Sequence, residues 1–522
     1  MEQKRRRLPL GIQSFEMSRK EGYVYVDKTD LVWKIANGSM FNYLSRPRRF
    51  GKSMLVDTLA CYFEGRKELF EGLKIMELEQ DWVQYPLIRF DMSEAGATVA
   101  EVNSYFARKF REQERQYSIE TFDGDSLADR FVNILRTISD KEKRPVVILI
   151  DEYDSPLQHS WHTPEHEACT AIYRSVFACL KSCTQYEKFV FITGITKFTQ
   201  ISMFSVLNNL TNISFFPEYA AVCGITVQET IDNFQPEIER FAEQNGLTVD
   251  GAVDLLKANY DGYHFSEDNM VDVFNPYSLI NALAQRKISN FWVTSGATAM
   301  LPKFVDDMEL KIKDFDNCYV DKVLLESSDV TGGGAELFLY QSGYLTIKGS
   351  EENDYILKIP NHEVRKALYA VVIPALIMRH DQALITAQTM MRRYFQQHML
   401  PEAMQSLKAL IADVPYSNKK LACMDMEERY RFIISSLFHA VGFRVEVERM
   451  MAKGRIDIVA RTSRYIYVIE LKLTKNGGVK AAEQQIRDNQ YTEPFKGEGK
   501  EVVALAIELE DNGKGLLEWA AL

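Results

Sequence analysis

The chain has 522 residues, of which 46% are hydrophobic and 26% charged, and it carries a formal net charge of −11. This length predicts about three domains rather than one, and the composition excludes a disordered chain. The negative charge excludes a generic polyanion binder, so any contact with nucleic acid would use a local basic patch. Seven scattered cysteines without zinc-binding spacing predict reduced thiols and a cytoplasmic protein.

The chain begins with a basic stretch, residues 1–7, but no apolar segment follows it, so no signal peptide is predicted. The longest apolar run, near residues 368–378, is short and contains Pro374. It predicts a buried helix and no membrane span.

The first predicted elements lead to a phosphate-binding loop. Residues 23–29 alternate like a strand, and a helix then leads to a short apolar strand at 42–45. A tight loop follows, and Gly-Lys-Ser stands at the start of an apolar helix at 54–60. Loop N–H groups and the positive end of that helix can hold a triphosphate. In this interpretation Lys52 reaches the β- and γ-phosphates and Ser53 ligates Mg2+.

One position departs from the usual loop, because Arg46 stands where the pattern begins with glycine. The residues expected to contact a nucleotide such as ATP are Arg46, Arg48, Arg49, Phe50, Gly51, Lys52, Ser53 and Met54. One of the three arginines can act as an arginine finger in cis, or a neighbouring subunit of a homo-oligomer can supply one.

A second motif supports the first. A strand at 86–91 and helices at 99–116 and 126–139 are followed by the apolar run 146–150, which predicts a buried parallel strand. The strand ends in Asp151, placed to hold Mg2+, and Glu152, placed to activate water. The alternative is a core strand with a solvated acidic turn. The two stretches together, in this order, indicate nucleotide binding.

A helix at 165–181 and another buried strand at 188–194 complete this region. Thr193 or Thr196, at the end of that strand, is a candidate sensor of the γ-phosphate, with a plain polar strand end as the alternative. Strands alternating with helices predict an α/β P-loop NTPase domain over residues 1–226, with a mostly parallel sheet and its ligand at the carboxyl edge.

The middle of the chain, residues 227–410, is mainly helical in pattern. Short strands are predicted at 337–339, 344–348 and 355–359, followed by a helix at 363–370. This arrangement fits part of a winged-helix-like unit, or more simply a hairpin that docks on the ATPase domain.

A second chemical site is predicted in the last region, residues 411–522. A helix at 427–441 precedes strands at 442–447, 454–460 and 465–473. These strands present Asp457, then Glu470 and Lys472, which share one face of their strand. Two carboxylates can bind Mg2+, or Mn2+, and the lysine can orient the attacking water, as a metal-dependent nuclease requires. The alternative is an ordinary Glu–Lys pair on a strand edge.

Further residues are candidates for the same site. Glu427 falls on the apolar side of its helix, where a carboxylate is costly unless it is paired or ligates metal, and Glu428 is the fallback. On the next predicted helix, Gln485 and Tyr491 are placed beside the metal or the nucleic acid.

The order of these motifs resembles the bacterial AAA-ATPase-like family, over residues 8–12, 25–29, 46–53, 151–154, 193–197 and 260–263. In that family the Arg-Pro-Arg-Arg-Phe form of the loop is the norm, which implies that Arg46 is compatible with nucleotide binding. The last region resembles a PD-(D/E)XK nuclease-like domain. The resemblance implies Asp457, Glu470 and Lys472 as its core, Glu427 as its helical acid and Gln485 as its later glutamine. Gly-Arg-Ile-Asp at 454–457 replaces the usual Pro-Asp.

The sequence therefore predicts an α/β protein with a P-loop domain, a helical middle and a restriction-endonuclease-like domain. The predicted function is an ATP-regulated, Mg2+-dependent nuclease acting on DNA or RNA, in defence against foreign nucleic acid. One alternative is a nucleotide-dependent switch or scaffold whose last domain binds nucleic acid without cutting it. A further alternative is a toxin-like effector that stays silent until it is triggered.

Overall fold

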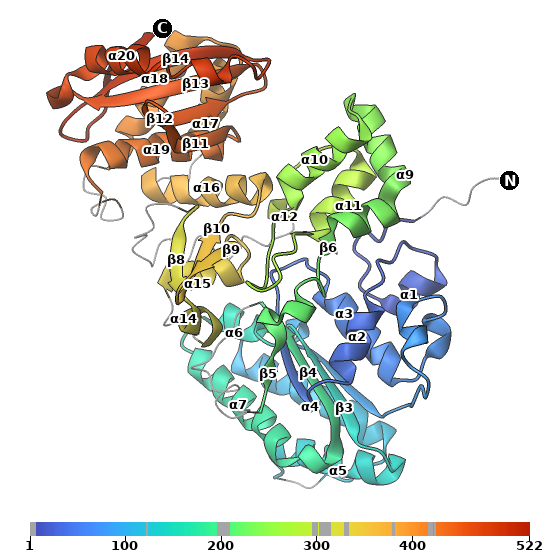
Figure 1. Cartoon of the computed structure of the whole chain (residues 1–522). Coiled ribbons are helices and arrows are strands. Elements are labelled where there is room, and N and C mark those ends of the chain that lie inside the picture. The colour runs from blue at the N-terminus through green and yellow to red at the C-terminus, as the bar shows by residue number, and fades with distance from the viewer. Residues whose placement is uncertain are drawn as a thin grey trace. The chain divides into compact units, whose positions relative to one another are not determined.

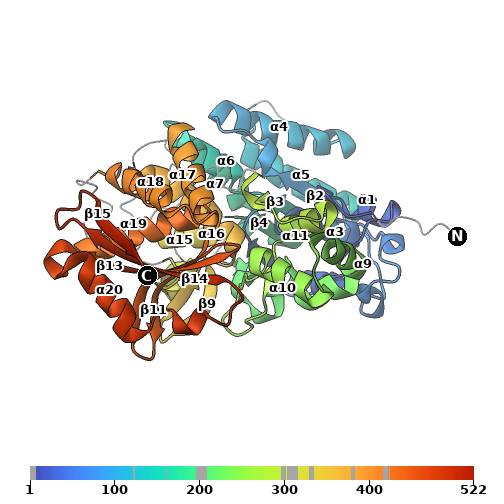
Figure 2. The same cartoon turned by 90° about the horizontal axis from the view of Figure 1, so that it is seen from above.

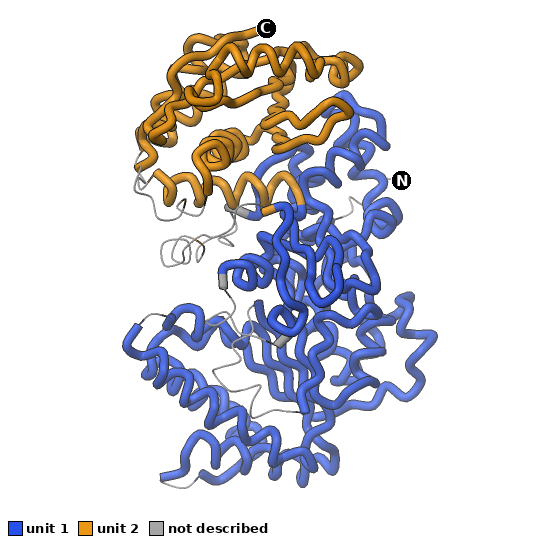
Figure 3. Tube along the Cα trace, turned by 60° about the vertical axis from the view of Figure 1, so that its left-hand side comes forward, with its two compact units in different colours: residues 1–292, 316–360 blue, residues 293–315, 361–522 orange. Residues whose placement is uncertain are grey.

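The computed structural model describes residues 7–121, 124–161, 163–195, 209–294, 301, 315–327, 334–377, 382–415, 421 and 424–522. The chain forms two compact units, coloured separately in Figure 3. Unit 1 comprises residues 1–292 and 316–360, and unit 2 comprises residues 293–315 and 361–522. The predicted division into three domains at 226 and 410 stays a prediction.

Unit 1 is built on a five-stranded parallel sheet with the strand order β2-β3-β4-β1-β5. The strands are β1 (Phe41–Ser45), β2 (Leu87–Asp91), β3 (Val146–Asp151), β4 (Glu187–Gly194) and β5 (Thr211–Asn212). The predicted strand at 188–194 thus lies between the loop strand and the Asp151 strand (Figure 1). The prediction of an α/β fold with a parallel sheet is confirmed.

Helices cover both faces of this sheet (Figure 2). They are α1 (Phe15–Lys20), α2 (Thr29–Ala36), α3 (Lys52–Phe63), α4 (Val99–Gln116), α5 (Leu127–Glu142), α6 (Ser155–Ser160) and α7 (His166–Ser182). Phe90 of β2 contacts aromatic rings of α4, α5 and α7 on one face. Phe63 of α3 packs on Phe189 of β4 at 4.9 Å between ring centroids. The sheet therefore carries buried aromatic side chains that pack against helices, as expected of a buried parallel sheet.

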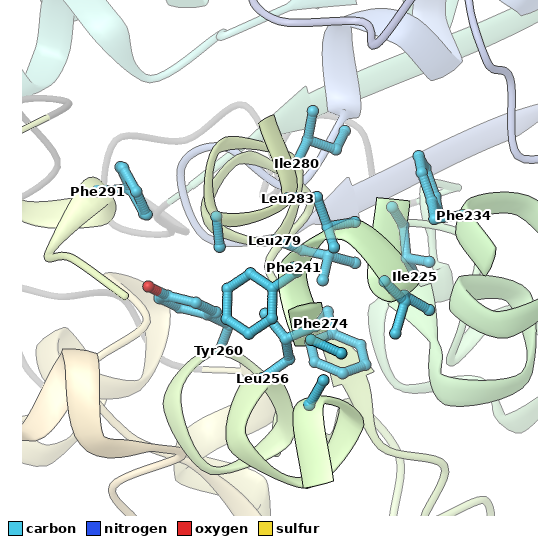
Figure 4. Close-up of a cluster of buried hydrophobic side chains, with 14 of the residues drawn as sticks. Ile225, Phe234, Phe241, Leu256, Tyr260, Phe274, Leu279, Ile280, Leu283 and Phe291 are labelled. Carbon is cyan, nitrogen blue, oxygen red and sulfur yellow. The ribbon is translucent and has the colours of Figure 1, made fainter. Parts of the chain in front are cut away.

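A second apolar core of unit 1 lies among helices and is drawn in Figure 4. The elements around it are β6 (Ile225–Thr226), α9 (Val227–Asn245), α10 (Val249–Tyr260), β7 (Val273–Phe274), α11 (Pro276–Gln285) and α12 (Phe291–Thr294). Thr226 and Glu229 form a capping box at the start of α9. The half-buried Lys28 pairs with Glu229 at 2.6 Å, which joins the entry segment to this helical part.

A three-stranded antiparallel sheet, β8-β10-β9, completes unit 1. Its elements are β8 (Cys318–Asp321), α14 (Lys322–Ser327), α15 (Gly334–Gln341), β9 (Thr346–Glu351) and β10 (Asp354–Lys358). The strand predicted at 337–339 was wrong, because these residues belong to α15. A short buried apolar run has no periodicity that separates strand from helix. The strand predicted at 23–29 was also wrong, since within that stretch only Tyr23 makes an isolated bridge.

Unit 2 carries a mixed five-stranded sheet, β11-β12-β13-β14-β15, in which only the β13–β14 pair is parallel. The strands are β11 (Arg444–Met451), β12 (Gly454–Arg461), β13 (Tyr465–Leu473), β14 (Glu501–Leu509) and β15 (Leu516–Ala521). The helices are α16 (His362–Ile377), α17 (Gln382–Gln396), α18 (Leu400–Ala412), α19 (Met426–Ala440) and α20 (Gly478–Asn489). The apolar run with Pro374 is a buried helix, α16, as predicted. Within the described ranges, no helix is long and apolar enough to cross a membrane.

Candidate nucleotide and metal sites

The phosphate-loop candidate joins β1 to α3. Gly51 caps α3 with a φ of 88°, a left-handed conformation that glycine adopts without strain. Lys52 is the first residue of the helix, and its Nζ donates hydrogen bonds to the carbonyls of Arg46 at 2.9 Å and Pro47 at 3.0 Å. Burial lowers the pKa of Lys52, although the charges of nearby acids oppose this. The lysine therefore lies across its own loop, held by neutral acceptors that a phosphate can replace.

Arg46 does not face the loop opening, where a phosphate contact was predicted. Its guanidinium is 2% exposed and donates hydrogen bonds to the carbonyls of Ser45, Ser214 and Tyr219 at 2.8, 2.8 and 3.0 Å. It also lies 4.1 Å from the ring centroid of Phe265. Arg46 thus holds the loop to later segments of unit 1, and this geometry supplies the rigidity that glycine gives elsewhere through a tight turn.

Phe50 also attaches the loop to later segments of unit 1. Its buried ring packs edge-on against Tyr263 at 4.8 Å and Phe265 at 5.5 Å between centroids. The segment 260–265, whose first four residues belong to the motifs of the family resemblance, therefore packs directly against the phosphate loop. Together with the hydrogen bonds of Arg46, this contact attaches the loop to later segments of unit 1.

The remaining loop residues lie nearer the surface. Arg48 is half-buried and donates a hydrogen bond to Gln158 Oε1 of α6 at 3.1 Å. Arg49 is exposed, with its guanidinium 5.0 Å from the ring centroid of Tyr277. Ser53 and Met54 are half-buried in the first turn of α3. The Ser53 hydroxyl lies close enough to Asp151 to lower the pKa of its carboxyl, so the two predicted Mg2+ ligands are neighbours.

Acidic side chains gather at the carboxyl edge of the sheet, beside the loop. Asp151 ends β3 and is buried, which raises the pKa of its carboxyl, although its hydrogen bond to Ser53 and the charge of Lys52 oppose the rise. Glu152 follows at a φ of 49°, and burial raises the pKa of its carboxyl too. Asp91, in register with Asp151 on β2, was missed by sequence reasoning. Its position at the end of a predicted strand was the available signal.

Thr193, one of the two sensor candidates, is fully buried on β4. Its carbonyl accepts a hydrogen bond from the Tyr153 N–H at 3.0 Å, and its Oγ1 has no hydrogen-bond partner among the described residues. Thr196 lies outside the described residues. The next position, Gly194, leaves no room for a Cβ, which would stand 2.6 Å from Asp154 Oδ1. The ends of β3 and β4 are therefore locked together beside the loop.

The second site lies in unit 2, where β12 and β13 separate. Their ladder ends at Ile458↔Ile469, just before Asp457 and Glu470 would pair. Asp457 Oδ2 instead accepts a hydrogen bond from the Leu471 N–H at 2.8 Å. Lys472 Nζ donates to Glu470 Oε1 at 2.9 Å. The structure thus brings together the three residues predicted as the nuclease core.

Glu470 is 1% exposed, and its Oε2 has no hydrogen-bond donor within the described part of the chain. Burial, and then the charge of Asp457, raise the pKa of the Glu470 carboxyl. Burial opposes the protonated form of Lys472, but the hydrogen bond to Glu470 and the charges of Glu470, Asp457 and Glu427 together outweigh it and raise the pKa of the lysine. A buried carboxylate oxygen without a donor is what a divalent cation would satisfy, so these residues fit a metal.

The other predicted residues lie around this centre. Glu427 is half-buried near Lys472 and accepts a weak hydrogen bond from Asn476 at 3.4 Å, whereas Glu428 caps its own helix. The described residues hold no group of three or more His, Cys, Asp or Glu side chains placed to bind one metal ion. Gln485 donates to the Tyr491 hydroxyl at 3.2 Å, and that hydroxyl donates to the Arg455 carbonyl at 2.9 Å. This pair supports the strand that carries Asp457.

Sequence reasoning also missed Arg431 of α19. Its guanidinium is buried and donates a hydrogen bond to Asp457 Oδ1 at 3.1 Å. The signal was weak, because an arginine four residues after Glu427 reads as part of a solvated helix face.

Two separate stretches of the chain match models of known protein families. Residues 9–204 match the model of the family described as predicted AAA-ATPase, and residues 425–519 match the PD-(D/E)XK nuclease superfamily. The chain therefore combines an ATPase-like domain with a domain of the PD-(D/E)XK nuclease superfamily. A protein of Azotobacter chroococcum mcd 1, described as an uncharacterized protein in the vnfD 5' region, is 28% identical over 98% of both chains.

Two similar solved structures come from Aeropyrum pernix. ORC1 in complex with DNA is 11% identical, with a TM-score of 0.25, and the match covers 65% of this chain and 90% of that one. ORC2, with ADPNP and ADP, is 12% identical, with a TM-score of 0.26, covering 66% of this chain and 93% of that one.

Proposed function

We propose that the protein is an ATP-regulated, metal-dependent nuclease that acts on DNA or RNA, with a role in defence against foreign nucleic acid. The observation that carries the proposal is the convergence of Asp457, Glu470 and Lys472 where β12 and β13 separate, with one buried oxygen of Glu470 lacking a donor among the described residues. Mg2+ or Mn2+ bound there would polarise the scissile phosphodiester and lower the pKa of a water.

Each residue of this proposed site has its own part. Asp457 and Glu470 hold the cation, and Lys472, fixed by its bond to Glu470, orients the attacking water and offsets negative charge on the phosphate. Glu427, half-buried near Lys472, is a further acid for the same site. Tyr491 and Gln485 keep β12 in place.

In the ATPase-like domain we propose that Lys52 contacts the β- and γ-phosphates and that Ser53 and Asp151 ligate Mg2+. Glu152 would activate the hydrolytic water. Ser53 lies close enough to Asp151 to lower the pKa of its carboxyl, which supports a shared metal. Thr193 is the proposed γ-phosphate sensor, because its buried Oγ1 has no partner among the described residues at the edge where the phosphate would lie. The arginine finger is proposed to come from Arg48, Arg49 or a neighbouring subunit.

A nucleotide-dependent switch that binds nucleic acid without cutting it is the second candidate. It is favoured by one observation: both carboxylate oxygens of Asp457 already accept hydrogen bonds, from Arg431 and from the Leu471 N–H. In this case the PD-(D/E)XK domain would bind nucleic acid without cutting it. The nucleotide bound to the ATPase-like domain would set the conformation of the protein.

The deciding experiment is cleavage of plasmid, linear duplex and single-stranded DNA and of RNA, with Mg2+ or Mn2+, with and without ATP. We expect cleavage that Lys472→Ala abolishes and that the nearby exposed Lys475→Ala leaves intact. The response to Lys52→Ala, beside Lys34→Ala on the exposed face of α2, shows whether ATP controls cleavage. Undiminished cleavage by Lys472→Ala would reject the assigned site, and no cleavage on any substrate would favour the switch.

A further inference from the structure

Arg431 places a fixed positive charge inside the proposed metal site. It projects from α19, and its side chain is 10% exposed. One guanidinium nitrogen lies 3.1 Å from Asp457 Oδ1 and the other lies 2.9 Å from Glu448 Oε1. The guanidinium therefore bridges the predicted metal ligand Asp457 and a second carboxylate that sequence reasoning did not consider.

The position of Glu448 is unusual. The register of β11 and β12 pairs Val447 with Ile458 and Arg449 with Ile456, so Glu448 stands opposite Asp457. Its φ of 52° lies in the left-handed region, which an L-residue in a strand rarely adopts. Local strain of this kind persists only where surrounding contacts impose it, and it concentrates at functional sites. Here the contacts are two arginines, Arg431 and Arg455, which both bond Glu448 Oε1.

We propose that Arg431 is a latch that neutralises Asp457 in the metal-free protein and must release it, while keeping Glu448, before Asp457 can ligate a cation. The inference rests on the proposed metal site. It adds that Arg431 competes with the metal ion for Asp457. It identifies Arg431 as a positioning residue and Glu448 as the anchor that holds the guanidinium after release.

Charge and burial lead to this inference. Asp457 Oδ2 accepts a hydrogen bond from the Leu471 N–H and Oδ1 accepts one from Arg431, so a cation at Oδ1 would meet the guanidinium directly. A divalent ion bound at Oδ1 would lie close to the guanidinium, and two cations in a buried site repel strongly. The arginine already has a second carboxylate partner, so it can move a short distance without becoming a buried unpaired charge.

The latch predicts opposite effects on stability and on metal affinity. In the full-length protein, Arg431→Met should lower the thermal midpoint without metal, because Asp457 loses its counter-ion. The same variant should bind Mn2+ about tenfold more tightly, as exchange of one ionic contact would give. Mn2+ titration by calorimetry, with no nucleotide present, gives the affinity, and thermal unfolding gives the stability.

Two other variants sharpen the test. Arg455→Met removes the other, half-exposed arginine of Glu448 without touching Asp457, so its Mn2+ affinity should match the wild type. Glu448→Gln removes the anchor and leaves Arg431 on Asp457 alone, so it should bind Mn2+ more weakly, by about threefold. If Arg431→Met fails to fold, Glu448→Gln still decides: an unchanged or tighter affinity overturns the latch.

Glu470→Gln separates this inference from the proposed function. If it abolishes Mn2+ binding but Arg431→Met does not tighten it, the metal site stands and the latch is wrong. If Glu470→Gln leaves Mn2+ binding unchanged, or if neither wild type nor Arg431→Met binds Mn2+, the metal site and the latch both fail. Binding that appears only in Arg431→Met would support the latch in its strongest form.

Discussion

The two candidate sites satisfy their charged groups in opposite ways. In unit 1 the cation Lys52 is held by two neutral carbonyls of its own loop. In unit 2 the buried carboxylates Asp457 and Glu470 are held by cations, Arg431 and Lys472. The lysine of the first site thus has neutral hydrogen-bond acceptors, with acidic side chains close enough to affect its pKa. The second has already neutralised the charges that a metal would use.

This difference has an energetic meaning. A buried cation with neutral partners loses hydration without gaining an ion pair, so its burial works against stability and favours any anion that arrives. A buried ion pair resists the loss of either member, since the other is left uncompensated. In the proposed function, a phosphate would therefore meet a cation held by neutral carbonyls in unit 1, whereas a metal ion in unit 2 would replace an existing contact.

Replacing Lys52 and Lys472 by methionine, one at a time, should show the difference between the two sites most clearly. Lys52→Met should weaken nucleotide binding about 100-fold, as loss of charge-assisted bonds predicts, yet leave the thermal midpoint unchanged or raised. Lys472→Met should lower stability by about 2 kcal/mol, because Glu470 is left buried without its cation. Nucleotide titration and thermal unfolding measure both arms. A midpoint that falls for Lys52→Met and holds for Lys472→Met would contradict the contrast.

The loop arginines offer a comparison within unit 1. Arg46→Met should destabilise the protein by about 3 kcal/mol, because two buried carbonyls and one half-buried carbonyl lose their donor. Arg49→Met, on the exposed side of the same loop, should change stability by less than about 1 kcal/mol. Denaturant unfolding measures both. Equal effects of the two substitutions would show that Arg46 does not hold the loop in place.

The sequence was informative wherever the chemistry is local. Gly51, Lys52 and Ser53 are consecutive at a helix start, and Glu470 and Lys472 share one strand, so spacing alone predicts their neighbourhood. The separation of β12 from β13 then brings Asp457 to them. Each of these predictions needed only one element or one hairpin.

Contacts between distant segments could not be predicted in this way. Arg46 contacts Phe265, and Arg431 reaches Asp457 from another element. Asp91 lies beside Asp151 only because β2 is the neighbour of β3, and strand order is not written in local periodicity. An arginine in a glycine position looked like a defect of the loop, although its buried partners make it part of the loop's support.

Glu187 provides a carboxylate to compare with Glu470, since both are buried and Glu470 accepts a hydrogen bond from a lysine. Glu187 begins β4, at the end of the strand away from Thr193, and neither of its carboxylate oxygens has a hydrogen-bond partner among the described residues. Burial raises the pKa of Glu187 from 4.5 to about 8. We therefore propose that Glu187 lowers the stability of the folded protein and has no part in either site.

The sign of the resulting pH dependence follows from proton counts. Between about pH 4.5 and pH 8 the folded protein keeps the Glu187 proton that the unfolded chain has lost, so this residue makes stability fall as pH rises through that window. Glu187→Gln removes the titration. We expect the variant to match the wild type near pH 4 and to be more stable by several kcal/mol at pH 9, because the pKa rises from 4.5 to about 8 and each pKa unit corresponds to about 1.4 kcal/mol. Denaturant unfolding across this range measures the difference, and a gap that stays constant with pH would show that the buried carboxyl does not carry the shift.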